Sequence, residues 1–262
     1  MQSALFIGGA LAFIYLMTCL GAAAVFFFRG SPSGKFQQIF LGFAAGVMIA
    51  ASIWSLLIPS IEEAEAQGLI GWIPAACGFL LGVLFLLGLD HIIPHLHPFS
   101  DVPEGPASSS KRSTLLVSAV TLHNIPEGMA VGLSFALAAQ GSDPVMYTSA
   151  LALALGIGIQ NFPEGAAITL PLVQEGMSKR KAFGFGCMSG AVEPLFGFLT
   201  VLLAAWIAPV MPWLLAFAAG AMIYVVVEEL IPEAHLGEHS HAGTLGVMAG
   251  FLMMMILDVA LG

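Results

Sequence analysis

Long apolar segments follow one another along almost the whole chain, separated by short polar stretches. Each segment has roughly the 20 residues that a helix needs to cross the hydrocarbon core of a bilayer. Because lipid offers no hydrogen-bond partners, a chain crosses it as helices or as a closed barrel, and runs this long favour helices. The sequence predicts eight transmembrane helices, at residues 4–28, 37–58, 69–90, 114–139, 146–173, 182–207, 210–232 and 243–261.

The composition agrees with an all-α integral membrane protein. Of the 262 residues, 58% are apolar and 9% are charged, whereas an average soluble domain has about 25% charged residues. We therefore expect a single transmembrane domain over 1–262, with the lipid bilayer as its surroundings. The formal charge of −9 comes from acids in the loops and inside the apolar segments, so we expect no nucleic-acid partner.

The basic residues predict the orientation in the membrane. The chain has seven Lys and Arg residues, and all fall in loops on the same side of the predicted helices. The positive-inside rule makes that side cytoplasmic, so both termini should be extracytoplasmic in a multi-pass protein of the inner (plasma) membrane. These residues are Arg29, Lys35, Lys111, Arg112, Lys179, Arg180 and Lys181.

Two stretches of sequence occur twice. FAAGVMI at 43–49 returns as FAAGAMI at 217–223, and GVLFLLGLD at 82–90 returns as GFLMMMILD at 250–258. In the predicted orientation the two copies cross the membrane in opposite directions, an inverted repeat that is typical of secondary transporters. The alternative is that small-residue contacts between helices look alike in many membrane proteins.

The repeat predicts a 3+2+3 arrangement of the eight helices. The first three helices occupy 1–91 and the last three 174–262, and these two sets form the inverted repeat. A Pro- and Ser-rich cytoplasmic loop at 92–113 should be flexible. The middle pair, within 114–173, carries the polar motifs described next.

Two similar polar motifs lie near the middle of predicted helices, HNIPEG at 123–128 and QNFPEG at 160–165. At about 3.6 residues per turn, His123 and Asn124 both lie one turn before Glu127, on adjoining faces. Gln160 and Asn161 stand in the same relation to Glu164. A carboxylate between two ligating side chains can bridge two cations.

The prolines of the motifs fit this interpretation. Pro126 and Pro163 each remove one helical hydrogen bond and displace the carbonyl four residues earlier. A freed carbonyl inside a membrane must face a cavity, water or an ion. The alternative is a packing kink whose carbonyl is satisfied by a neighbouring helix.

The charges inside the predicted helices are all of one sign. Glu127, Glu164 and Glu193 lie well within them, and no predicted helix has an internal Lys or Arg. An ionised residue at the bilayer centre costs at least ~2.5–3.5 kcal/mol, so either some carboxyls are protonated or a bound cation supplies the missing charge. Histidine, carboxylate and amide ligands without thiolate suit Zn²⁺, Fe²⁺, Mn²⁺ and Co²⁺ and disfavour Cu⁺, and histidine argues against a pure Ca²⁺ or Mg²⁺ site.

HNIPEG, QNFPEG and the glutamate of GAVEP at 190–194, Glu193, in an eight-helix chain resemble the ZIP family of divalent-metal transporters. The resemblance covers essentially the whole chain. It implies a transporter, not an enzyme, that carries divalent metal into the cytoplasm by alternating access. One helix bundle would slide or rock against another. Zn²⁺ is the foremost substrate implied, with Fe²⁺, Mn²⁺, Co²⁺ and Cd²⁺ as further ones, and relatives suggest a homodimer.

The resemblance also implies a binuclear site at the membrane midplane, whose two halves share Glu127 and Glu164. Met48 matches a methionine that bacterial members place beside the first half, with ordinary packing as the alternative. Some members have aspartate where this chain has Asn161, so the second half would carry one negative charge fewer. The first half would comprise His123, Glu127, Gln160 and Glu164. The second would comprise Asn124, Glu127, Asn161, Glu164 and Glu193.

Two further polar clusters adjoin the cytoplasmic ends of predicted helices. His-rich loops can hold metal weakly, and we expect these clusters to form the exit path, with solvated loops as the alternative. The exit residues are Asp90, His91, His95, His97, Glu228, Glu229 and His235.

Two other functions are the alternatives to transport. An intramembrane metallohydrolase would need a metal with an open position for water and a general base, and the chain has no H-E-x-x-H motif. A metal-sensing receptor would bind metal without transporting it, and no soluble output domain is predicted.

Overall fold

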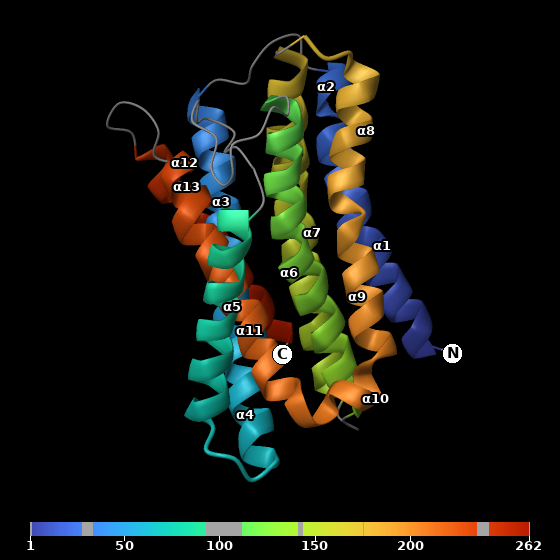
Figure 1. Cartoon of the computed structure of the whole chain (residues 1–262), viewed down its shortest axis with the longest axis vertical. Coiled ribbons are helices and arrows are strands. Elements are labelled where there is room, and N and C mark those ends of the chain that lie inside the picture. Colours follow the sequence, from blue (N-terminus) through green and yellow to red (C-terminus); the bar gives the residue numbers. More distant parts are fainter. Residues whose placement is uncertain are drawn as a thin grey trace.

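The computed structural model describes residues 2–27, 34–92, 112–140, 144–174, 176–234 and 241–261, and every element in these ranges is a helix (Figure 1). The all-α prediction is confirmed. The elements are α1 (Gln2–Ala22), α2 (Ala24–Phe27), α3 (Gly34–Ala51), η1 (Ser52–Leu57), α4 (Ile58–Ala66), α5 (Trp72–Ile92), α6 (Arg112–Gln140), α7 (Pro144–Gln174), α8 (Lys179–Gly190), α9 (Val192–Leu202), α10 (Ala204–Ile207), η2 (Ala208–Val210), α11 (Met211–Val225), η3 (Val226–Leu230), α12 (Ile231–Ala234) and α13 (Ala242–Leu261).

Within the described ranges, seven stretches are long and apolar enough to cross a membrane. They correspond to seven of the eight predicted helices. The eighth, α6, has 29 residues and carries HNIPEG, but it is not among the seven. The seven are Leu5–Phe27, Gln38–Ala66, Trp72–Leu89, Val145–Leu170, Lys179–Leu202, Ala208–Leu230 and Ala242–Ala260.

Two helices are interrupted by widened turns, each just before an Ile-Pro pair. In η1 the amide of Ile58 bonds to the carbonyl of Ile53, and in η3 the amide of Ile231 bonds to the carbonyl of Val226. These are π-helical i→i+5 bonds, which the chain adopts where the following proline has no N–H to continue the α-helical pattern. The second membrane helix consequently continues through η1 and α4, beyond its predicted end at residue 58.

The two copies of the repeated sequence make corresponding contacts. α3 packs along α13, and α11 packs along α5. A Cβ added at Gly250 would collide with the carbonyl of Phe43, and one at Gly82 would collide with the carbonyl of Phe217. Phe43 and Phe217 begin the two FAAG sequences, so each copy brings the same residue against a glycine of the paired helix.

The helices form two groups that stand side by side in Figure 1. One group contains α3, α4, α5, α11 and α13, and the other contains α1, α6, α7, α8 and α9. The groups meet where α6 contacts α11 and where α7 contacts α3 and α13. The apolar core continues across this junction and is rich in alanine, including Ala44, Ala130, Ala154 and Ala219.

Candidate functional site

The two polar motifs face each other across α6 and α7. The side-chain amide of Gln160 donates a 2.8 Å hydrogen bond to Glu127 Oε1. Both side chains are fully buried. The structure thus brings together the two glutamate motifs that the sequence placed on separate helices.

Helices α9 and α1 add a third carboxylate and its donors. Glu193 is fully buried and accepts two hydrogen bonds, 2.6 Å from Asn161 Nδ2 to Oε2 and 3.0 Å from Thr18 Oγ1 to Oε1. Asn161 Nδ2 also donates to the carbonyl of Ile14 at 3.2 Å. Four helices therefore converge on one buried polar cluster.

The amide nitrogens of this cluster are used as donors, while several of its oxygens have no hydrogen-bond partner in the part of the chain that the structure describes. Asn124 Nδ2 donates to the carbonyl of Ser189 at 3.0 Å. A buried polar atom without a hydrogen bond costs about 1–3 kcal/mol, so four together are a strong departure from ordinary packing. The four oxygens without a hydrogen-bond partner among the described residues are Asn124 Oδ1, Glu127 Oε2, Gln160 Oε1 and Asn161 Oδ1.

The glycine that ends each motif lets a neighbouring helix approach the site. A Cβ at Gly128 would collide with the backbone of Glu193, and one at Gly165 would collide with the carbonyl of Thr18. Residues larger than glycine would therefore push α9 away from α6 and α1 away from α7. Each P-E-G sequence therefore places a glutamate next to a glycine, and the glycine allows a neighbouring helix to pack close to the site.

The structure describes some, but not all, of the remaining predicted ligands. Glu164 is 9% exposed on α7, and Met48 is fully buried in the apolar core on α3. His123 lies on α6, but its side chain is outside the described residues. Among the side chains that are described, no three His, Cys, Asp or Glu residues form a ready metal cluster. The described part of the site is thus a mixture of carboxylates and amides.

The structure also describes only some of the predicted exit residues. His91 is exposed near the end of α5, with Nδ1 2.7 Å from the carbonyl of Leu87. In η3, Glu228 is exposed and Glu229 is buried. The side chain of Asp90 and residues His95, His97 and His235 lie outside the described residues.

Sequence reasoning missed Thr18 and Ser189, which hold Glu193 and Asn124 in place. A hydroxyl within a membrane helix often bonds the carbonyl four residues earlier, and Thr18 does so with Ile14 at 3.2 Å. That ordinary role gives no signal of a second partner. The second partner of Thr18, Glu193, is seen only once α1 is packed against α7 and α9.

Comparison with known proteins identifies the family. The ZIP zinc transporter family model matches residues 100–258. Zinc transporter ZIP11 of Homo sapiens is 37% identical over 95% of each chain, and zinc transporter GufA of Myxococcus xanthus is 40% identical over 94% of each. Zinc transporter ZIPB of Bordetella bronchiseptica is 40% identical over 98% of this chain and 81% of its own. These relatives are named as transporters, which are not enzymes. The chain belongs to the ZIP zinc transporter family.

Proposed function

We propose that this protein carries Zn²⁺ across the membrane into the cytoplasm through the buried cluster between α6, α7, α9 and α1. The observation that carries the proposal is a set of four buried oxygens, one of them on Glu127, that have no hydrogen-bond partner among the described residues and lie in the cluster with Glu164 and Glu193. Oxygens that only accept are what a cation requires, and a divalent ion would also offset the carboxylate charge. Among the described residues that line the cluster, no Lys or Arg is available to do so.

The proposed binuclear site has two halves that share Glu127 and Glu164. Gln160 belongs to the first half with His123, and Asn124, Asn161 and Glu193 belong to the second. Carbonyl oxygens of amides are weak, neutral ligands, which suits an ion that must be released. The same oxygen and imidazole donors would accept Fe²⁺, Mn²⁺, Co²⁺ and Cd²⁺, and we propose these as further substrates.

The arrangement in two groups supports transport by alternating access. The polar cluster lies within one group, while the buried core of the junction with the other group is apolar and rich in small residues. Sliding or rocking along such a junction would break few hydrogen bonds. The corresponding contacts at Gly82 and Gly250 support an inverted repeat, the architecture in which two halves exchange conformations around a central site.

The orientation follows from the basic end of the molecule. The start of α8, which carries Lys179, Arg180 and Lys181, lies at the same end as α2 and α12 (Figure 1). We propose that this end is cytoplasmic, in the inner membrane, with α6 as the eighth span and both termini outside. His91, Glu228 and Glu229 would then line the path by which the ion leaves the protein for the cytoplasm. We also propose that the protein acts as a homodimer.

Uptake of radioactive zinc into proteoliposomes tests the function. We expect uptake by the native protein and none by Glu127→Gln, whose side chain keeps its size but loses its charge. The matched control is Glu65→Gln, a similar change at an exposed site on α4. A protein that binds zinc but transports none would be a sensor, and would overturn the proposal.

A further inference from the structure

An apolar crevice of about 360 Å³ lies between α1, α3 and α7. Every described residue that lines it is a Met, Ile, Phe or Pro. Ile39 and Ile159 are 44% and 37% exposed, so the crevice opens onto the outer surface of the helix bundle. All three helices belong to stretches that are long and apolar enough to cross a membrane. The crevice therefore faces the hydrocarbon region of the bilayer.

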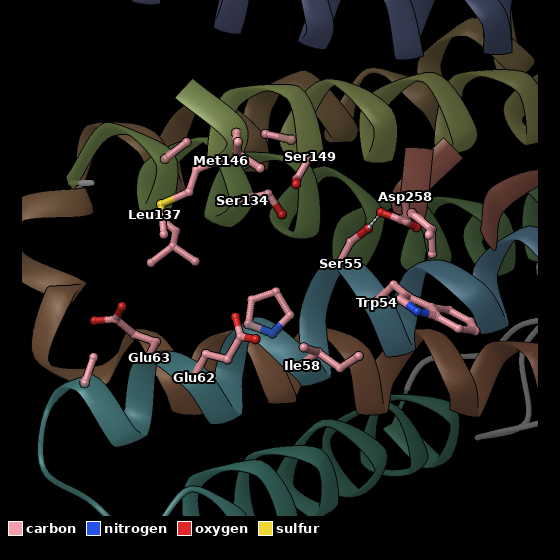
Figure 2. Close-up of a pocket in the computed structure, with 16 residues that line it drawn as sticks. Trp54, Ser55, Ile58, Glu62, Glu63, Ser134, Leu137, Met146, Ser149 and Asp258 are labelled. Carbon is pink, nitrogen blue, oxygen red and sulfur yellow. Dashed lines mark hydrogen bonds between the residues drawn. The ribbon is translucent and has the colours of Figure 1, made fainter. Parts of the chain in front are cut away.

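The lining of this crevice differs from that of the larger cavity, about 640 Å³ in volume, beside α4 (Figure 2). Figure 2 shows the carboxylates of Glu62, Glu63 and Asp258 around the larger cavity, and such groups hold water. The crevice offers no side chain of that kind among the described residues. Apolar cavities stay dry and take up apolar molecules. In a bilayer the apolar molecules at hand are lipid acyl chains, so a chain is the occupant that fits.

The crevice lies where the two groups of helices meet. Helices α1 and α7 belong to one group, and α3 belongs to the other. On one side the wall is closed, because a Cβ added at Gly21 of α1 would collide with the carbonyl of Phe162 on α7. On the other side α3 also packs on α7 and contributes Ile39 and Phe40 to the lining. An acyl chain in the crevice would therefore contact both groups.

The crevice reaches from one end of α3 to the depth of the buried polar cluster. Its inner wall includes Pro163, which belongs to the QNFPEG motif and precedes Glu164. Its outer part includes Ile39, five residues after the start of α3 at Gly34. A chain that enters beside Ile39 would thus extend inward toward the level of the site, as the tail of a lipid in one leaflet does.

Lys35 lies at the end of α3 where a lipid head group would be. It is exposed and precedes Ile39 by four residues, about one helical turn, so the two share a face of the helix. No Asp or Glu on α3 offsets its charge. Lysines at the ends of membrane helices extend toward the interface, where they attract acidic lipids.

We propose that the crevice binds one acyl chain of an acidic phospholipid whose head group lies at Lys35. The binding requires only that these helices span a bilayer, so it does not rest on the proposed transport of zinc. A chain held between α3 and the pair α1 and α7 fits the present arrangement of the two groups. Sliding or rocking of one group against the other would change the shape of the crevice.

Fluorescence quenching in reconstituted vesicles tests the site. A tryptophan is introduced in the full chain as Phe40→Trp, and phospholipids with brominated chains, which quench tryptophan on contact, are added to phosphatidylcholine vesicles. We expect brominated phosphatidylglycerol to bind more tightly than brominated phosphatidylcholine on the order of fivefold, the attraction that one basic residue ordinarily has for acidic lipid. Adding Lys35→Gln should remove this preference. The native protein gives the background of its own tryptophans.

The matched control is Leu84→Trp on α5, a lipid-facing position that is 50% exposed and lies outside the crevice. It should be quenched equally by the two lipids. If Phe40→Trp does not fold, Ile39→Trp at the mouth of the crevice gives the same comparison. The proposal is overturned if the crevice tryptophan shows no preference for phosphatidylglycerol, or a preference that survives Lys35→Gln. Absence of zinc uptake by the native protein overturns the proposed function and leaves the quenching result standing.

Discussion

Gln160 and Glu127, on different helices, are joined by a 2.8 Å hydrogen bond from the amide nitrogen to Oε1. The bond joins α7 to α6, and Gln160 Oε1 and Glu127 Oε2 have no hydrogen-bond partner among the described residues. A neutral amide can hold a carboxylate in place, but it cannot cancel its charge. The two motifs therefore form one acidic unit, and their functional effects should be coupled.

A carboxylate shared by two ions should matter more than a ligand of one. We predict that Glu127→Ala or Glu164→Ala abolishes zinc uptake in proteoliposomes. Asn161→Ala should leave partial activity, because it removes a ligand of the second half only, together with one of the two hydrogen bonds that Glu193 accepts. Equal and mild losses in all three variants would contradict a binuclear site.

The closeness of α6 and α9 predicts a packing effect. Gly128→Ala should destabilise the protein by about 1–3 kcal/mol, the usual cost of an overpacked contact, because the new methyl group meets the backbone of Glu193. It should also lower uptake by moving Glu193 away from the site. Thermal unfolding in detergent measures the first effect.

The matched control for this packing effect is Gly184→Ala on α8. Apart from its own helix backbone, no atom of the described residues lies within 4 Å of a Cβ placed there, so the added methyl should be neutral or slightly stabilising in the helix. If both variants unfold at the same temperature as the native protein, the close approach of α6 and α9 is wrong.

The positions of most helices could be predicted from the sequence because apolar length alone decides which segments cross a bilayer. The ends of the helices are harder to predict. The helix that begins near residue 37 was expected to end at 58, yet it continues to Ala66. The widened turn at η1 accommodates Pro59, which has no N–H to donate, and the helix goes on.

The ligands near the centre could be predicted because spacing along a helix fixes which side chains share a face. The hydrogen-bond partners that other helices supply could not be predicted. Thr18 and Glu193 are 175 positions apart, and Ser55 and Asp258 are 203 apart. Such pairs depend on how helices pack, and a single sequence contains no measure of that. In the sequence Asp258 is only the last residue of the second repeat copy, whereas the structure gives it a buried hydrogen-bond partner, Ser55.

The orientation in the membrane can be tested with single cysteines in a variant from which Cys19, Cys77 and Cys187 have been removed. Ser178 is exposed just before the basic start of α8, so Ser178→Cys should react with impermeant thiol reagents only from the cytoplasmic side. Ser109→Cys should behave alike, and Ser142→Cys should react only from outside; both lie outside the described residues. A reversed pattern would overturn the orientation that the basic loops predict.

Protons and metal should compete for the same atoms. His123 must be neutral, and Glu127, Glu164 and Glu193 must be deprotonated, before they can hold a cation. Lower pH favours the protonated forms, so acid should weaken metal binding and metal binding should release protons. We predict that the apparent affinity for zinc falls as pH drops from about 7.5 to about 5.5, the range in which histidine ordinarily titrates.

Calorimetry in buffers of different ionisation enthalpy counts the released protons. In the native protein the count should exceed zero. In the Glu127→Gln variant it should be smaller, because a neutral amide has no proton to release, and Glu65→Gln at its exposed position should match the native protein. A count of zero, with an affinity that is flat across this pH range, would mean that these side chains do not contact the ion. The central site would then have to be sought elsewhere in the helix bundle.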